Sequence, residues 1–182
     1  MRLNGSIYRG FRKGYPKLWI LADCKTHLVL STHCGRGPGS DLVGLEELLN
    51  GLEERYRFKT LLADAGFDCE RVHELIHKLF NARSVIPPTK IRKNTTPKKP
   101  FRRKMGKLFR TGSPKIYKKR WQIETVFSMI KRNLSPALTA RTKSSQNREL
   151  SLLAITHNII ITAALFLNLL KAFYRAHLRS LN

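Results

Sequence analysis

Strand-like and helix-like segments alternate over the first ninety residues, and this order constrains the fold more than any other feature of the sequence. Two β-rich runs separated by three residues come first and predict a hairpin. The predicted strands are 15–23, 27–33, 59–63 and 84–87, and the predicted helices begin near Asp41 and at Cys69. Alternating strands and helices are typical of an α/β domain in which helices cover a sheet.

The second half of the chain is predicted to be mainly helical. Residues 89–113 are rich in Lys, Arg and Pro and are expected to form a loop. Helical patterns follow at 115–134 and at 146–181. Because a length of 182 residues fits one domain, we expect a single domain over 1–182 with a basic insertion at 89–116.

Positive charge is concentrated in one third of the chain. Residues 89–148 contain 19 of the 35 Lys and Arg residues and a single acidic residue, Glu124, so they carry +18 of the net charge of +23. This charge indicates a polyanionic partner, and nucleic acid is the default, although an anionic membrane surface satisfies the charge equally well. Cations favour the charged form of a carboxylate among them, which makes Glu124 a candidate metal ligand.

Two features argue against secretion and membrane insertion. The three cysteines cannot all pair with one another, and the first residues do not resemble a signal peptide, so a disulfide-stabilised secreted protein is not expected. Leu152–Leu170 is long and apolar enough to span a bilayer, but His157, Asn158 and Asn168 are costly in hydrocarbon. We therefore expect this segment to pack as a helix across the domain, with no membrane involved.

One helix face between Tyr117 and Lys131 collects a hydroxyl, two cations and a carboxylate. At about 100° per residue, the side chains of Tyr117, Arg120, Glu124 and Lys131 fall within an arc of about 60°. An apolar stripe beside them could dock the helix on a sheet. Cations and hydroxyls bind phosphate oxygens and a carboxylate binds a divalent metal, so this face suits a phosphodiester site. An ordinary amphipathic helix with a mixed polar face would show the same spacing.

The same four residues form the pattern Tyr-x2-Arg-x3-Glu-x6-Lys, which resembles that of the DDE transposases of bacterial insertion sequences. Upstream, the segment 61–68 resembles the family's second catalytic strand, which ends in an aspartate before a Gly-aromatic-Asp turn, and here that aspartate is Asp64. Residues 85–88 resemble the next strand, and segments within 16–41 resemble the family's second and third strands. The resemblance extends over about residues 7–170.

The resemblance implies an RNase H-like mixed sheet flanked by helices, with carboxylates that hold Mg²⁺ ions, for which Mn²⁺ can substitute. It assigns Asp64 and Glu124 as catalytic metal ligands, and Tyr117, Arg120 and Lys131 as residues that position the DNA backbone. The implied reaction is hydrolysis at the ends of an insertion sequence, followed by strand transfer into target DNA. Double-stranded DNA is then the expected partner, and the chain is expected to act on it as a homodimer. The expected location is the bacterial cytoplasm, in association with the nucleoid.

The first of the three carboxylates that the family uses has no counterpart in this sequence. In the family it lies on the opening strand, upstream of the segment that here begins at Met1, and no aspartate precedes Asp23. Asp23 ends the following strand and is expected to be structural. We therefore expect a chain that lacks the first strand and is defective in transposition. The alternative is a basic nucleic-acid-binding protein without catalysis, which explains the charge but leaves Asp64 and Glu124 without a role.

Two weaker patterns suggest zinc. His73-Glu74-Leu75-Ile76-His77 matches the H-E-x-x-H motif on a predicted helix, but no third ligand follows at the usual spacing and the helix carries an ordinary apolar stripe. Cys24, His27, His33 and Cys34 fall within eleven residues, yet adjacent residues of a strand point to opposite faces. We expect neither pattern to bind zinc.

Overall fold

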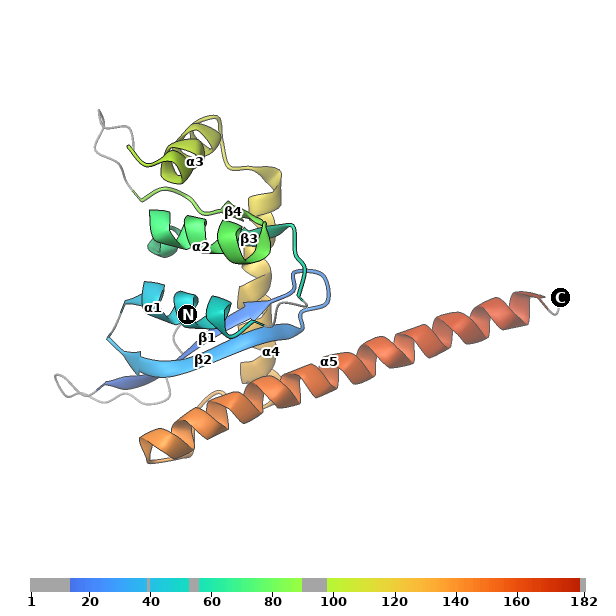
Figure 1. Cartoon of the computed structure of the whole chain (residues 1–182). Coiled ribbons are helices and arrows are strands. Elements are labelled where there is room, and N and C mark those ends of the chain that lie inside the picture. Colours follow the sequence, from blue (N-terminus) through green and yellow to red (C-terminus); the bar gives the residue numbers. More distant parts are fainter. Residues whose placement is uncertain (1–13, 39, 53–55, 90–97, 181–182) are drawn as a thin grey trace.

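The computed structural model describes residues 14–38, 40–52, 56–89 and 98–180. The elements in order are β1 (Tyr15–Ala22), β2 (Val29–Gly37), α1 (Asp41–Asn50), β3 (Thr60–Leu62), the 3₁₀ turn η1 (Ala65–Phe67), α2 (Glu70–Phe80), β4 (Arg83–Val85), α3 (Pro100–Arg110), the 3₁₀ helix η2 (Lys115–Trp121), α4 (Gln122–Asn133) and α5 (Lys143–Ser180). The predicted α/β class and the alternation of strands and helices up to β4 are confirmed (Figure 1).

β1 and β2 form the predicted antiparallel hairpin, with Tyr15 opposite Gly37 and Ala22 opposite Val29. β2 extends to Gly37, beyond the end of the strand predicted at 27–33. The carboxylate of Asp23 accepts hydrogen bonds from the backbone N–H groups of Lys25 (3.1 Å) and Thr26 (2.7 Å) and thereby closes the turn. Asp23 therefore has the structural position that the sequence analysis expected.

Helices cover both faces of the hairpin, because its side chains alternate between two cores (Figure 1). Trp19 and Leu21 pack on the side of α1 and α2, against a buried cluster that includes Leu49 and Ile76. Leu18 points to the opposite side, where it packs with Phe127 of α4 and with Leu150 of α5. The apolar stripe predicted for α4 thus docks on the sheet as expected, with Val126, Phe127 and Ile130 buried.

β3 and β4 form a second, parallel pair, with Thr60 opposite Arg83 and Leu62 opposite Val85. In the described part of the chain the four strands therefore make two separate two-stranded sheets, where the sequence analysis expected one mixed sheet. β1 pairs only with β2 and β3 only with β4 among these residues, so each keeps one free edge.

Residues 100–110, within the segment that we predicted to be a basic loop, form helix α3. The N-terminal cap of α3 comes from the first turn of α2, because the carboxylate of Glu70 accepts hydrogen bonds from the backbone N–H groups of Phe101 (2.9 Å) and Arg102 (3.0 Å). Met105 is buried beneath the helix. The prediction was wrong here because it considered local composition only, whereas the capping carboxylate lies 31 residues upstream.

Helix α5 packs on the hairpin in its first half only. Asn158 exchanges two hydrogen bonds of 2.8 Å with the backbone of Val29, and Nε2 of His157 lies 3.0 Å from the carbonyl oxygen of His27. Every residue from Thr162 to His177 is exposed, and this part of the helix projects away from the body (Figure 1). The expectation that the apolar C-terminal segment packs across the domain is therefore wrong beyond this point.

Candidate functional site

Asp64 and Glu124 reach the same place from two elements far apart in the sequence. Asp64 follows β3 and directly precedes η1, so the end of a buried strand sets its position. Glu124 lies in the first turn of α4, whose apolar side is fixed against the hairpin. Both side chains remain more than half exposed, at 58% for Asp64 and 55% for Glu124. Two carboxylates on rigid supports are thus accessible to a ligand.

The guanidinium of Arg120 joins these two carboxylates. Its Nη1 lies 3.0 Å from Oδ1 of Asp64, and its Nη2 lies 3.1 Å from Oε1 of Glu124. The sequence analysis placed Arg120 and Glu124 on one face of an α-helix, and the structure keeps them adjacent but changes the helix type. Residues 115–121 form a 3₁₀ helix, and α4 begins only at Gln122. Such 3₁₀ segments are common at the N-termini of α-helices.

Tyr117 stands beside Arg120, with the guanidinium carbon 5.9 Å from the ring centroid. Its other neighbour is Phe109 of α3, which meets the Tyr117 ring edge to face at 5.3 Å. Burial raises the pKa of the Tyr117 phenol, and the nearby Asp64 carboxylate raises it further. The phenol therefore stays protonated at neutral pH and can donate a hydrogen bond to an anionic ligand.

Lys131 lies apart from this cluster, in the last turn of α4. Seven residues separate it from Glu124, which is about 10 Å along the helix axis. Lys131 is half-buried and follows Ile130, which packs into the core between α4 and the hairpin. Of the five predicted site residues, the structure thus brings together Asp64, Tyr117, Arg120 and Glu124. Lys131 lies at the other end of α4, away from them.

A pocket of about 540 Å³ opens next to the two carboxylates. The free edges of β1 and β3 form two of its walls, through residues 18–24 and 60–64. Its floor is largely apolar, and Asp64, Arg120 and Glu124 line it as well. The pocket therefore separates the two sheets and ends at the polar cluster.

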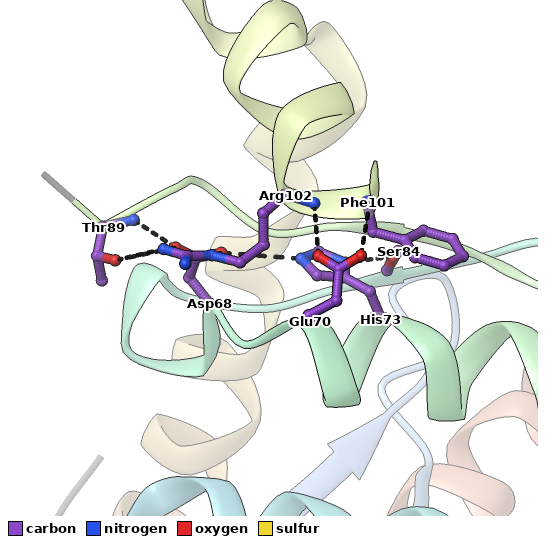
Figure 2. Close-up of polar contacts among 7 residues, drawn as sticks. All are labelled: Asp68, Glu70, His73, Ser84, Thr89, Phe101 and Arg102. Carbon is purple, nitrogen blue, oxygen red and sulfur yellow. Dashed lines mark hydrogen bonds and ion pairs between the residues drawn. The ribbon is translucent and has the colours of Figure 1, made fainter. Parts of the chain in front are cut away.

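A buried ion pair anchors α3 next to the strand that leads to the site (Figure 2). The Asp68 side chain is fully buried and receives hydrogen bonds from Nε (3.0 Å) and Nη2 (2.7 Å) of Arg102. Thr89 adds a backbone N–H at 2.8 Å and its hydroxyl at 2.9 Å. Because Phe109 of the same helix touches Tyr117, the ion pair positions one wall of the candidate site.

The histidines of the H-E-x-x-H pattern have structural contacts. His73 is completely buried, its Nδ1 lies 2.6 Å from the Ser84 hydroxyl, and its ring stacks on Phe101 (Figure 2). Burial lowers the pKa of His73, so the ring is neutral. The His77 ring packs against Phe101 at 5.8 Å. Both histidines therefore fix α3 to α2.

The four residues of the second zinc pattern have separate partners and do not converge. Cys24 approaches the carbonyl oxygen of Lys119, His27 contacts Gln122, His33 packs on Trp19, and Cys34 approaches the carbonyl oxygen of Asn147. Within residues 14–38, 40–52, 56–89 and 98–180, no group of three or more His, Cys, Asp or Glu side chains converges as a metal site would require.

The donor set at Arg120 nevertheless fits a hard divalent cation. Mg²⁺ is commonly held by one or two carboxylates, with water and substrate phosphate as the remaining ligands. Asp64 and Glu124 supply such a pair, and the guanidinium that now bridges them shows that their negative charges attract one cation jointly. Their exposure leaves room for water and phosphate.

A family model described as "Transposase DDE domain" matches residues 5–159. Neither the curated proteins nor the solved structures contain a match to the chain.

Proposed function

Because the chain belongs to the transposase DDE domain family, we propose that the cluster of Asp64, Arg120 and Glu124 acts on DNA phosphodiesters at the ends of an insertion sequence. The reaction is hydrolysis of one strand followed by strand transfer into target DNA. The observation that carries the proposal is the shared ion pair, in which one guanidinium holds carboxylates from β3 and α4 together.

Each residue of the cluster has a separate task. Asp64 and Glu124 would hold Mg²⁺, which would supply Lewis-acid stabilisation of the attacking and leaving oxygens. Arg120 pairs with both carboxylates while no metal is bound, and it can turn its N–H groups to phosphate oxygens, for which a guanidinium is well suited. Tyr117 donates its phenol hydrogen to the same backbone, and Lys131 contacts a phosphate further along the duplex.

The basic helices next to the cluster support a DNA substrate. Lys118, Lys119 and Arg120 lie in the last turn of η2, and Lys107 and Arg110 lie in the last turn of α3. The bound form is a homodimer on double-stranded DNA, in the cytoplasm of a bacterium and associated with its nucleoid.

We also propose that a further strand completes an RNase H-like sheet between β1 and β3. The support is the pocket of about 540 Å³, which has a free strand edge on each side and an apolar floor. Neighbouring strands lie about 4.8 Å apart, so a single strand in this pocket could pair with both edges. By the resemblance described above, this strand would carry the third carboxylate.

The variant Glu124→Gln is expected to weaken Mn²⁺ binding by at least about tenfold, because even the loss of an outer-shell partner costs metal sites 10–100-fold. Gln keeps the length of the side chain but removes the charge that a hard cation requires. Electron paramagnetic resonance of free Mn²⁺ during a titration measures the affinity of the wild type and the variant.

Two matched variants make this titration specific. Glu47→Gln removes an exposed carboxylate on α1 and is expected to leave Mn²⁺ binding unchanged. Arg120→Gln removes the cation that now neutralises Asp64 and Glu124, so it is expected to bind Mn²⁺ at least as tightly as the wild type. Equal affinities for the wild type and Glu124→Gln would contradict the proposed site.

Plasmid nicking tests the absence of a third carboxylate. The wild-type chain in Mg²⁺ is expected to nick supercoiled plasmid no faster than its Asp64→Asn variant, since among the described residues no third carboxylate converges with Asp64 and Glu124. Gel electrophoresis of the relaxed product gives the rate. Nicking by the wild type that disappears in Asp23→Ala would contradict this expectation and would assign the third carboxylate to Asp23, which lines the same pocket.

A further inference from the structure

Helix α5 presents opposite sides to the body and to solvent. Leu150, Ala154 and His157 face the body and are buried. The hydrogen bonds between Asn158 and Val29 fix this side of the helix to the hairpin. The outer side carries exposed large apolar residues from Leu152 to Tyr174. This stretch includes the part of the helix that projects from the body (Figure 1).

The outer apolar residues follow a heptad spacing. Leu152, Ile159, Phe166 and Phe173 lie seven residues apart, and 60%, 63%, 59% and 75% of each is exposed. Ile155 lies three residues after Leu152 and is 55% exposed, and Leu169 lies three residues after Phe166 and is 68% exposed. We call these six residues the outer seam. An apolar repeat at a and d positions is the pattern with which one helix packs along another.

A bilayer does not fit this helix, although its length and composition meet the usual criteria for a candidate span. Asn158 is bonded to the folded hairpin, which keeps the preceding turns out of a membrane. Only the twelve residues from Ile159 to Leu170 then remain before Lys171. Twelve helical residues extend about 18 Å, well short of the bilayer core of about 30 Å.

The size and charge of the surface fit a second copy of the chain. The six residues of the outer seam are 55% to 75% exposed. Together they present on the order of 700 Å² per chain, comparable with the roughly 800 Å² that each partner buries in a stable interface. No charged residue lies between Leu150 and Leu170, so most of the seam is free of like charges that would face each other across the interface.

We propose that two copies of the chain associate through the outer seam of α5, with the two helices packed side by side. Each seam supplies the knobs and the holes for the other, so a single surface forms the whole interface. This rests on the proposed function in one respect, since it names the surface through which the dimer on DNA forms. Its test measures molecular mass and therefore fails or succeeds independently of metal and DNA binding.

Sedimentation equilibrium of the full chain tests the interface, in about 0.5 M NaCl, where repulsion between the basic bodies is screened. The wild type is expected to have twice the mass of one chain. Phe166→Glu places a charge in the seam and is expected to weaken association by roughly 30-fold or more, as loss of a central aromatic anchor does. Phe166 is exposed in the single chain, so the substitution is expected to leave the fold unchanged. Circular dichroism verifies this.

The matched control is Leu167→Glu, which replaces a neighbouring apolar residue of similar exposure (54%) outside the seam. It is expected to remain a dimer. Equal weakening by both variants would overturn the seam and indicate unspecific apolar contact. A wild type that stays monomeric and floats with phosphatidylcholine vesicles would overturn the proposal and assign α5 to a membrane surface.

Discussion

Arg102→Met is expected to destabilise the fold by about 3–5 kcal/mol, the usual cost of leaving a buried charge without its partner. The Asp68 carboxylate is fully buried, and two of its hydrogen bonds come from Arg102. Thr89 alone cannot replace a cation, because its groups are neutral. Urea denaturation followed by circular dichroism measures the free energy of unfolding.

Arg103→Met is the matched control for this substitution. Arg103 is the next residue on α3, is exposed, and its guanidinium donates a hydrogen bond of 2.9 Å to the carbonyl oxygen of Lys98. Its loss is expected to cost no more than about 1 kcal/mol. The double variant Asp68→Leu/Arg102→Met should recover part of the stability, since it removes both charges. A similar cost for Arg102→Met and Arg103→Met would show that the ion pair does not hold α3.

The ion pair between Asp68 and Arg102 also determines how the free energy of unfolding depends on pH in the acidic range. Burial raises the pKa of Asp68, but the hydrogen bonds from Arg102 and Thr89 lower it more, so the net pKa lies below the ordinary value of 3.8. The unfolded chain therefore takes up a proton at higher pH than the fold does. This contribution to stability is complete above about pH 5 and is lost as the pH falls through the pKa of the folded state. Arg102→Met should flatten that part of the profile.

Duplex DNA affinity is expected to fall by about 10³–10⁵-fold as salt rises from about 50 to about 200 mM, the range for six to ten phosphate contacts. The segment 89–148, with its charge of +18, supplies enough cations for a footprint of this size. Fluorescence anisotropy of a labelled duplex measures the affinity at each salt concentration.

Lys131→Gln and Lys171→Gln locate the footprint on the molecule. Lys131 lies on α4 with the proposed site, and its loss should reduce the slope of log affinity against log salt by about one. Lys171 lies on the projecting part of α5, away from the site, and its loss should leave the slope unchanged (Figure 1). A slope that is reduced in Lys171→Gln but not in Lys131→Gln would contradict this footprint, because it would place the DNA on the projecting part of α5.

The parts of the fold that the sequence predicted are those with local causes. The hairpin, α1, β3, α2 and β4 follow from apolar runs and turn residues within each segment. Helix α3 has local signals as well, with Pro100 in its first turn and Phe101, Met105 and Phe109 spaced four apart. The sequence analysis gave more weight to the density of Lys and Arg. The contacts that hold α3 in place come from Asp68 and Glu70, more than 30 residues upstream.

The sequence predicted only those contacts of the candidate site that join neighbouring residues. Spacing places Arg120 one helical turn before Glu124, so their contact could be expected from the sequence. The contact between Arg120 and Asp64 joins residues 56 positions apart and depends on how α4 packs against the strands. Likewise, the departure of α5 from the body after Ile161 depends on where the hairpin ends, which the apolar composition of the helix does not reveal.

Localised cleavage by iron tests most directly whether Asp64 and Glu124 hold one metal ion. Fe²⁺ bound in place of Mg²⁺ generates hydroxyl radicals in the presence of ascorbate and peroxide, and these cut the polypeptide next to the ion. Mass spectrometry of the fragments is expected to show cuts near Asp64 and near Glu124, both suppressed by excess Mg²⁺ and both lost in Glu124→Gln. Cuts between His73 and His77 instead, or cuts that Mg²⁺ does not suppress, would contradict the site.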